Sequence, residues 1–201
     1  MRNQQPKYTS GEKALTHEEY NKLLKVITDI EDELMIRLCV ATGLRREDLC
    51  NIECDNLKLK EKTLLFHEQK KDRRVRNKDK TYTGEVIEMW RTIDIPNDII
   101  VLINKFYNSL NKATLKKRKY VFSYVGRTAH RHFWAWCDVA GIERRPIHAL
   151  RATCIKFAHE AGWKDEAISK LTGDKIATIQ AHYMTPSTEE MKQITNNMQF
   201  A

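Results

Sequence analysis

The feature that most constrains the fold of this chain is a helical run with almost no polar face. The sequence "DELMIRLCVATG", residues 32–43, is apolar on nearly all sides, which is typical of a helix buried among other elements. Gly43 supplies the left-handed residue that ends such a helix. Helical spacing resumes in "REDLCNIECDNL", residues 46–57. Leu44 and Arg45 are therefore predicted to lie in a tight corner between two helices, where packing on both sides holds a side chain in place.

The rest of the pattern predicts a mostly α (α+β) fold with one small antiparallel β-sheet of about three strands. Thr16 and Glu19 have the spacing of a capping box, which starts a helix. Segments 62–71 and 90–96 have β-rich composition and predict two antiparallel strands, with a third at 57–60 left open. The remaining predicted elements are a strand-like piece at 121–124 and helices at 97–110, 128–141, 144–162 (with Pro146 at its first position), 165–173, 175–183 and 188–198.

Positive charge gathers in two places. The formal net charge of +8 and the pI near 9.2 favour a polyanionic partner, although many proteins of other classes share such values. Residues 70–80 hold seven Lys or Arg against two Asp, in a connection far longer than a hairpin turn requires. This segment is either a solvated flexible loop or a DNA-contacting loop. With the second basic cluster at 116–120, the candidate DNA-binding residues are Lys70, Arg73, Arg74, Arg76, Lys116, Lys117 and Arg118.

What the sequence lacks disfavours several classes of protein. Its five cysteines are an odd number without a disulfide framework, so reduced thiols are expected. Cys50 and Cys54 lie one helical turn apart without a second pair at zinc spacing, so packing is the favoured interpretation. The sequence shows no apolar run of membrane length, secretory signal or glycine-rich phosphate loop. We therefore expect a soluble intracellular protein with no metal and no nucleotide cofactor.

Reactive or cationic side chains on a fixed backbone occur at three places in the sequence. Arg45 lies in the helix corner, His148 and Arg151 share one predicted helix, and Tyr183 precedes a turn signal. His148 and Arg151 are three residues apart, so both point to the same helix face. Taken singly, each place has an ordinary structural explanation, since a corner arginine usually pairs with a carboxylate and a tyrosine before a turn usually packs.

Taken together, these places match a known pattern. The segments "ATGLRREDLCNI", "HALRATCIKFAHEAG" and "LTGDKIATIQAHYMTP" resemble, in order and spacing, the three boxes of the tyrosine recombinase (phage integrase) family. The resemblance extends from about Leu15 to Met191, nearly the whole chain. It implies a tyrosine recombinase-like fold and an active site made of Arg45, Lys71, His148, Arg151, Asp174 and Tyr183.

The resemblance also implies a reaction and a role for each residue. In the family the tyrosine, here Tyr183, attacks a DNA phosphodiester, forms a 3′-phosphotyrosine link and frees a 5′-hydroxyl. Two arginines hold the phosphate, His148 assists by hydrogen bonding or proton transfer, and a lysine protonates the leaving oxygen. That lysine corresponds to Lys71, with Lys70 as the alternative. Because the covalent link keeps the bond energy, the family requires neither ATP nor a metal.

Physical chemistry explains why two arginines suit this reaction. A free tyrosine has a pKa near 10, so forming the phenolate at pH 7 costs about 4 kcal/mol. Each close guanidinium lowers the pKa of an anion by about 1–3 units, so Arg45 and Arg151 could offset most of that cost. The planar guanidinium also binds two phosphate oxygens at once.

The sequence departs from the family at Asp174, where the family has His or sometimes Trp. An ionised carboxylate accepts hydrogen bonds, cannot donate one to a phosphate oxygen, and repels the phosphate charge. We consider three roles for Asp174: it accepts the tyrosine proton, it orients an arginine, or it marks weakened activity.

Residues 1–13 are polar and predict a flexible N-terminal arm. A catalytic domain is expected at 14–186 and a C-terminal helix or tail at 187–201. In the family this tail commonly docks on a neighbouring subunit, and recombination assembles four subunits around two DNA duplexes. Packing of the tail on its own subunit is an equal expectation. Because family members usually carry a preceding DNA-clamping domain, we expect either a fragment or a member without that clamp.

The sequence thus predicts a site-specific DNA recombinase, an integrase of a virus, plasmid or transposon, associated with DNA in the cytoplasm or nucleoid of its host. A type IB topoisomerase-like enzyme shares the same chemistry and is one rival. The other rival is a DNA-binding protein that keeps the fold and has lost the reaction, and Asp174 is its best argument.

Overall fold

The structure, a computed structural model, describes residues 13–183, 192, 195 and 196, with His182 and Tyr183 described as backbone only. Of the arm expected at 1–13, only Lys13 is among the described residues. Most of the tail expected at 187–201 also lies outside them, including its predicted helix at 188–198 apart from residues 192, 195 and 196.

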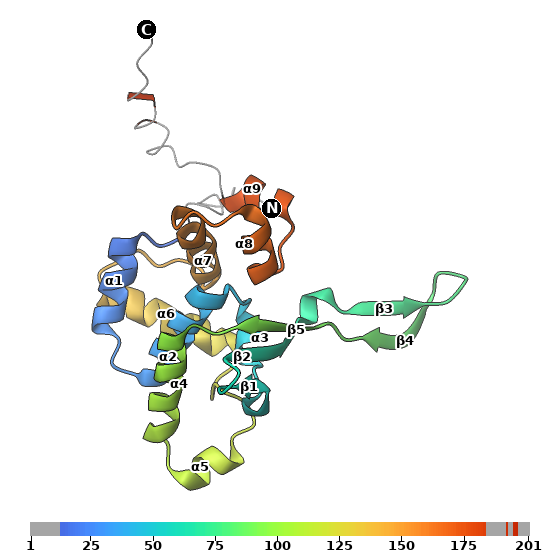
Figure 1. Cartoon of the computed structure of the whole chain (residues 1–201), viewed down its shortest axis with the longest axis horizontal. Helices are drawn as coiled ribbons and strands as arrows, with labels where there is room; N and C mark the ends of the chain where they lie inside the picture. The colour runs from blue at the N-terminus through green and yellow to red at the C-terminus, as the bar shows by residue number, and fades with distance from the viewer. Residues whose placement is uncertain (1–12, 184–191, 193–194, 197–201) are drawn as a thin grey trace, which may run out of the picture.

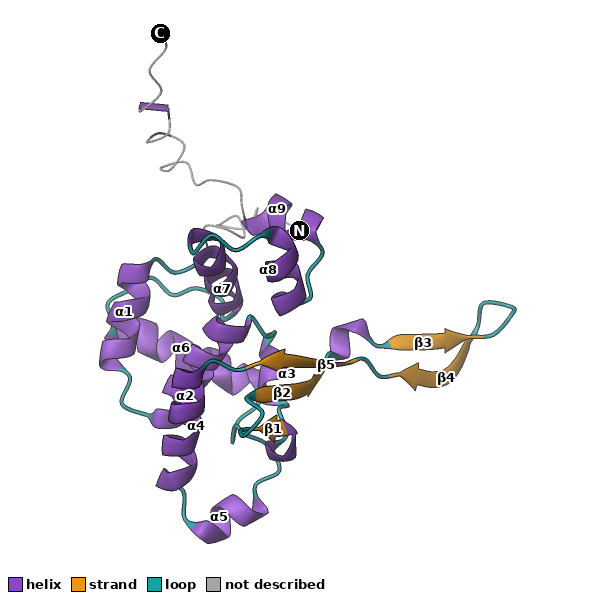
Figure 2. Ribbon diagram, in the orientation of Figure 1, coloured by secondary structure: helices purple, strands orange, loops and turns teal. Residues whose placement is uncertain are grey.

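Helices make up most of the described chain, as the sequence predicted (Figure 2). The capping box is present, since Thr16 Oγ1 accepts from Glu19 N while the Glu19 carboxylate accepts from Thr16 N. In the described part, no helix could span a membrane by its length and apolar character. The helices are α1 His17–Val26, α2 Ile30–Thr42, α3 Arg46–Cys50, α4 Asn97–Ser109, α5 Lys112–Lys117, α6 Gly126–Val139, α7 His148–Glu160, α8 Asp165–Thr172 and α9 Ile176–Tyr183, with 3-10 turns η1 Cys54–Asn56 and η2 Gln69–Lys71.

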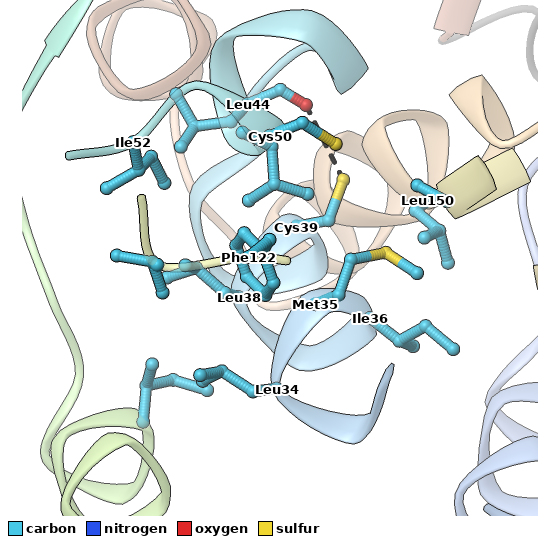
Figure 3. Close-up of a cluster of buried hydrophobic side chains, with 14 of the residues drawn as sticks. Leu34, Met35, Ile36, Leu38, Cys39, Leu44, Cys50, Ile52, Phe122 and Leu150 are labelled. Atoms are coloured by element: carbon cyan, nitrogen blue, oxygen red, sulfur yellow. Dashed lines mark hydrogen bonds between the residues drawn. The ribbon is translucent and has the colours of Figure 1, made fainter. Parts of the chain in front are cut away.

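Helix α2 runs through the core, where α4, α6 and α7 pack against it, which confirms that this apolar run is buried. It begins at the N-cap Asp29, whose side chain accepts from Asp32 N, and ends at Gly43 with φ 63°. Figure 3 shows its buried side chains against those of neighbouring segments. Burying one such aliphatic side chain stabilises the fold by about 1.5–3 kcal/mol. The labelled residues are Leu34, Met35, Ile36, Leu38, Cys39, Leu44, Cys50, Ile52, Phe122 and Leu150.

The expected three-stranded antiparallel sheet is present, in the order β1-β2-β5. Its strands are β1 Leu57–Lys58, β2 Thr63–His67 and β5 Trp90–Asp94. Strand β2 alternates half-buried and buried positions, with Leu64 and Phe66 facing the core. The register places Leu64 opposite Ile93 and Phe66 opposite Arg91. Arg91 is therefore on the core-facing side of this sheet.

The basic segment between β2 and β5 is not the flexible loop that was one of its two interpretations. It forms a second, two-stranded antiparallel sheet from β3 Arg73–Arg76 and β4 Tyr82–Ile87. Arg74 pairs with Val86 and Arg76 with Tyr82, with an irregularity between the two pairs. We call residues 73–87 the β3–β4 arm, because Figure 1 shows this hairpin projecting away from the body of the molecule.

Two local predictions were wrong. Segment 121–124 is not a strand: Tyr120 forms an isolated bridge with Glu53, and the chain then bends. Val121 N donates to Ile52 O, so this segment ties to the chain after α3 instead of joining a sheet. Helix α7 begins at His148, two residues beyond Pro146, whose carbonyl accepts from Ala149 N in a preceding turn.

Candidate active site

Arg45 occupies the predicted corner between α2 and α3, where it is the N-cap residue of α3. The backbone before it is fixed by close packing at Gly43: a Cβ there would lie 2.9 Å from Thr172 Cγ2 and 3.2 Å from Cys154 Sγ. The positive φ and this close approach both favour glycine. The corner therefore packs directly against α7 and the end of α8, which brings three distant segments together.

Arg151 is the most buried cation of the site, with 1% of its surface exposed. It extends from α7 and donates to the carbonyl of Gly43, to Thr172 O at 2.9 Å and to Asp174 Oδ2. An unpaired buried charge would be costly, so these acceptors keep the guanidinium in place. Arg151 thus ties the α2–α3 corner to the end of α8.

Asp174 bridges the two predicted phosphate-binding arginines. Its Oδ1 accepts from Arg45 Nη2 at 3.0 Å, and its Oδ2 lies 2.7 Å from Arg151 Nη2. The carboxylate is held in turn by its backbone, because Ser169 Oγ donates to Asp174 O. Of the three roles considered for Asp174, this geometry supports the orientation of arginines. We call Arg45 and Arg151 the arginine clamp.

Lys71 also reaches the site. It ends η2, and its Nζ lies 3.2 Å from Glu68 Oε1, which in turn accepts from Arg45 Nη1 at 2.9 Å. Nζ would also lie 2.9 Å from a Cβ built on Gly173, the residue before Asp174. Lys70 and Lys71 are both exposed, so the difference between them is the contact of Lys71 with Glu68. The geometry therefore favours Lys71 over Lys70 as the site lysine.

His148 begins α7 on an exposed position. Partial burial of the ring, followed by the charge of Arg151, lowers the pKa of His148 to about 4. The ring is therefore neutral at pH 7 and can donate through one nitrogen only. Tyr183 is the last residue of α9, which packs on α7 and α8 through Ile179. The side chain of Tyr183 lies outside the described residues, so its approach to the arginine clamp stays a prediction.

The comparison with known families decides the identity of the fold. The phage integrase family model matches residues 13–190. The chain belongs to the phage integrase family. This match confirms the resemblance carried by the three sequence boxes. No curated protein sequence matches the chain.

Solved structures of phage integrase and recombinase proteins share the fold. The XerA recombinase superposes with a TM-score of 0.67 at 16% identity, covering 93% of this chain and 66% of that one. The Tn1549 transposon integrase bound to transposon right end DNA gives 0.66 at 15% identity, covering 98% and 67%. The catalytic domain of bacteriophage HP1 integrase gives 0.58 at 17%, covering 92% and 94%. This chain thus spans less than two thirds of the XerA recombinase chain.

The sequence predicted a DNA interface made of basic residues, so the structure's placement of these residues bears on that prediction. Lys70 and three arginines of the β3–β4 arm are exposed, as are Lys116 and Lys117 at the end of α5. Arg118, which was expected to face DNA, instead has its guanidinium turned toward the protein. Its Nη2 donates to Glu31 Oε1 at 2.7 Å and to Val121 O, and its guanidinium lies 5.0 Å from the centre of the Phe106 ring. Arg118 therefore ties the segment after α5 to Glu31 of α2 and lies against Phe106 of α4.

Three site residues were missed from the sequence. Glu68 and Asp48 are buried carboxylates beside Arg45, and burial raises the pKa of Asp48. Arg91 donates to Lys170 O and Thr172 O, which caps the C-terminal end of α8 with a positive charge. Strand alternation could have found Arg91, since it shares a face with Ile93. The described residues contain no group of three potential metal ligands.

Proposed function

We propose that this chain is a site-specific DNA recombinase of the integrase type, which cleaves and rejoins DNA through a 3′-phosphotyrosine intermediate. In this proposal Tyr183 is the nucleophile and the arginine clamp holds the scissile phosphate. Lys71 protonates the leaving oxygen, and His148 donates a hydrogen bond to the phosphate. We further propose that the chain belongs to a mobile element and acts as a tetramer on two DNA duplexes.

One observation carries the proposal: Arg45 and Arg151, from separate sequence boxes, converge on a single carboxylate. Both guanidiniums contact Asp174, within 3.0 Å for Arg45 and 2.7 Å for Arg151. Two guanidiniums at this spacing can also bind the non-bridging oxygens of one phosphate. Charge that grows on those oxygens during attack would be stabilised by donors that are already in place.

The proposed reaction needs no group that the chain does not supply. The Tyr183 oxygen forms a bond to phosphorus while the bond from phosphorus to O5′ breaks. The phenol proton passes to solvent or a nearby base, and O5′ takes a proton from the Lys71 ammonium. Attack by a 5′-hydroxyl on the phosphotyrosine reverses these steps and rejoins the strand.

The proposed DNA interface consists of the exposed basic residues around this site. Lys70 precedes the β3–β4 arm, which carries Arg73, Arg74 and Arg76 on its surface. Such contacts to phosphates give salt-dependent binding with little sequence preference. The similar Tn1549 transposon integrase structure contains transposon right end DNA, which supports a DNA partner for this chain.

A nicked suicide substrate tests the nucleophile. Cleavage releases a short fragment that cannot be rejoined, so wild-type protein should accumulate as a covalent DNA adduct that survives denaturation. Tyr183→Phe removes the attacking oxygen and should abolish the adduct, a loss of at least about 10³-fold. Tyr20→Phe, in α1 and outside both the site and the proposed DNA interface, is the matched control and should retain it. An adduct of unchanged yield in Tyr183→Phe would contradict the assignment.

The structure also offers an argument for a second function, a DNA-binding protein without the reaction. Asp174 occupies the guanidinium edges that a phosphate would need, and its negative charge repels a phosphate. Under this alternative wild-type protein binds DNA but forms no adduct, and Asp174→His creates or raises cleavage. If Asp174 instead orients the clamp, Asp174→His lowers cleavage. Measuring both binding and adduct formation separates the two functions.

A further inference from the structure

Glu68 is a buried carboxylate that none of the sequence boxes contains. It follows the last residue of β2, and only 4% of its side chain is exposed. Its backbone is fixed at the base of the arm, because Glu68 N donates to Met89 O and Glu68 O accepts from Lys71 N. A carboxylate with so little solvent requires close positive partners to remain ionised.

Positive partners surround this carboxylate on several sides. Oε1 accepts from Arg45 Nη1 at 2.9 Å and lies 3.2 Å from Lys71 Nζ, while Oε2 lies 3.5 Å from Arg91 Nε. Without Glu68, these cations would repel one another at short range. The single oxygen Oε1 therefore links one arm of the arginine clamp to the lysine.

The same group packs against the turn that carries Asp174. A Cβ on Gly173 would lie 2.8 Å from Glu68 Oε1 and 2.9 Å from Lys71 Nζ. Arg91 binds the last carbonyls of α8 from the other side, at Lys170 and Thr172. Any side chain at position 173 would collide with Glu68 and Lys71, so glycine lets both groups lie against this turn.

We propose that Glu68 is a positioning residue that holds the Lys71 ammonium beside the arginine clamp, where it can protonate the leaving O5′. This inference rests on the proposed cleavage reaction and adds to it a residue that never touches the DNA. A lysine side chain is long and flexible, and about 40% of that of Lys71 is exposed. The contact with Glu68 selects the conformer that points toward the clamp.

The chemistry of the leaving group supplies a readout that a merely structural role would not change. Cleavage of the natural phosphodiester expels O5′, which must take a proton from an acid such as Lys71. When sulfur replaces that bridging oxygen, the thiolate leaves without a proton, because a thiol has a pKa of only about 8.5. A residue that acts through the acid should therefore matter for the oxygen substrate and hardly matter for the sulfur substrate.

The experiment compares single-turnover cleavage of matched 5′-oxygen and 5′-sulfur suicide substrates. Glu68→Gln keeps the shape and removes the charge, and it should cut the oxygen substrate ~10–100-fold more slowly while losing less than ~3-fold on the sulfur substrate. Lys71→Ala should show the same pattern. Arg151→Lys, in the clamp, should be slow on both substrates. Glu61→Gln, an exposed residue of the β1–β2 turn, should match wild type.

The outcomes separate this inference from the proposed function. The positioning role would be overturned if Glu68→Gln had the same ratio of sulfur to oxygen cleavage rates as wild type while Lys71→Ala recovered its rate on the sulfur substrate. The cleavage reaction would stand in that case. Wild-type protein that forms no adduct with either substrate would overturn both. Circular dichroism checks folding. If Glu68→Gln does not fold, Glu68→Asp, which keeps the charge but withdraws it from Nζ, takes its place with the same expected ratio.

Discussion

Two pairs of β-strands that follow one another in the chain differ in burial: one pair packs its side chains into the core, and the other is exposed on both faces. Strands β2 and β5, residues 63–67 and 90–94, form a platform whose inner side chains enter the core, with Leu64 at 0% and Phe66 at 2% exposure. The β3–β4 arm continues from both strands, yet every residue of β4 is exposed. An isolated two-stranded hairpin has no hydrophobic face to hold it and is only marginally stable.

Arginine shows the same contrast between platform and arm. On the platform, Arg91 uses its donors on the carbonyls at the end of α8 and stacks 5.0 Å from the Phe66 ring. On the arm, Arg76 has a neighbouring tyrosine as its partner, since its Nη2 donates to Tyr82 Oη at 2.8 Å. The platform guanidinium stabilises the protein, whereas exposed arm guanidiniums can exchange solvent for phosphate at little cost.

The largest expected effect is on stability. Phe66→Ala removes a buried ring from the platform and should lower the free energy of unfolding by about 3–5 kcal/mol. Val86→Ala, on the arm, removes a side chain that is 51% exposed and should change it by less than about 0.5 kcal/mol. Urea unfolding followed by circular dichroism measures both. Equal losses in the two variants would show that the arm belongs to the same cooperative core.

This contrast also explains what the sequence could predict of the fold. The buried helix and the platform strands were predictable because their apolar residues recur with the period of the element that buries them. The arm has no such period, because neither of its faces is buried. Its Lys, Arg and Asp residues therefore indicated a loop, and the pairing of Arg74 with Val86 became visible only in the structure.

The next effect concerns DNA. Replacing Arg73, Arg74 and Arg76 together by Ala should leave the platform folded and weaken binding to a duplex. The logarithm of the binding constant falls linearly with the logarithm of the salt concentration, and three lost phosphate contacts would make this negative slope shallower by about 3. Fluorescence anisotropy across a salt series measures this slope. Replacing Lys116 and Lys117 on α5 gives a matched comparison, and a larger change there than in the arm would move the DNA interface to α5.

The site was predictable where its residues belong to the three boxes. Arg45, Arg151 and Asp174 converge, and the spacing of their boxes indicated them. Glu68 was not indicated, because it follows β2 and no sequence feature marks a carboxylate there as buried. Strand alternation places Arg91 on the face of Ile93, but it does not say which groups the guanidinium contacts. Their roles follow from contacts between segments far apart in the chain, which only the folded arrangement defines.

The smallest expected effect is a pH dependence of stability that arises at His148 in the site. The β3–β4 arm, residues 73–87, contains no histidine and so does not contribute to it. The folded state holds the pKa of His148 at about 4, below its ordinary 6.5. Between these values the unfolded chain binds a proton that the folded chain does not, so the free energy of unfolding falls as pH falls through this window. Because His148 is exposed, we expect a loss of only about 1 kcal/mol.

His148→Gln should remove that part of the pH dependence in urea unfolding at pH 7 and pH 4.5. The pKa of His130 is also lowered by burial, but His130 is present in both proteins and cancels from their difference. Identical pH dependence in the two proteins would show that the His148 ring is fully solvated beside the arginine clamp.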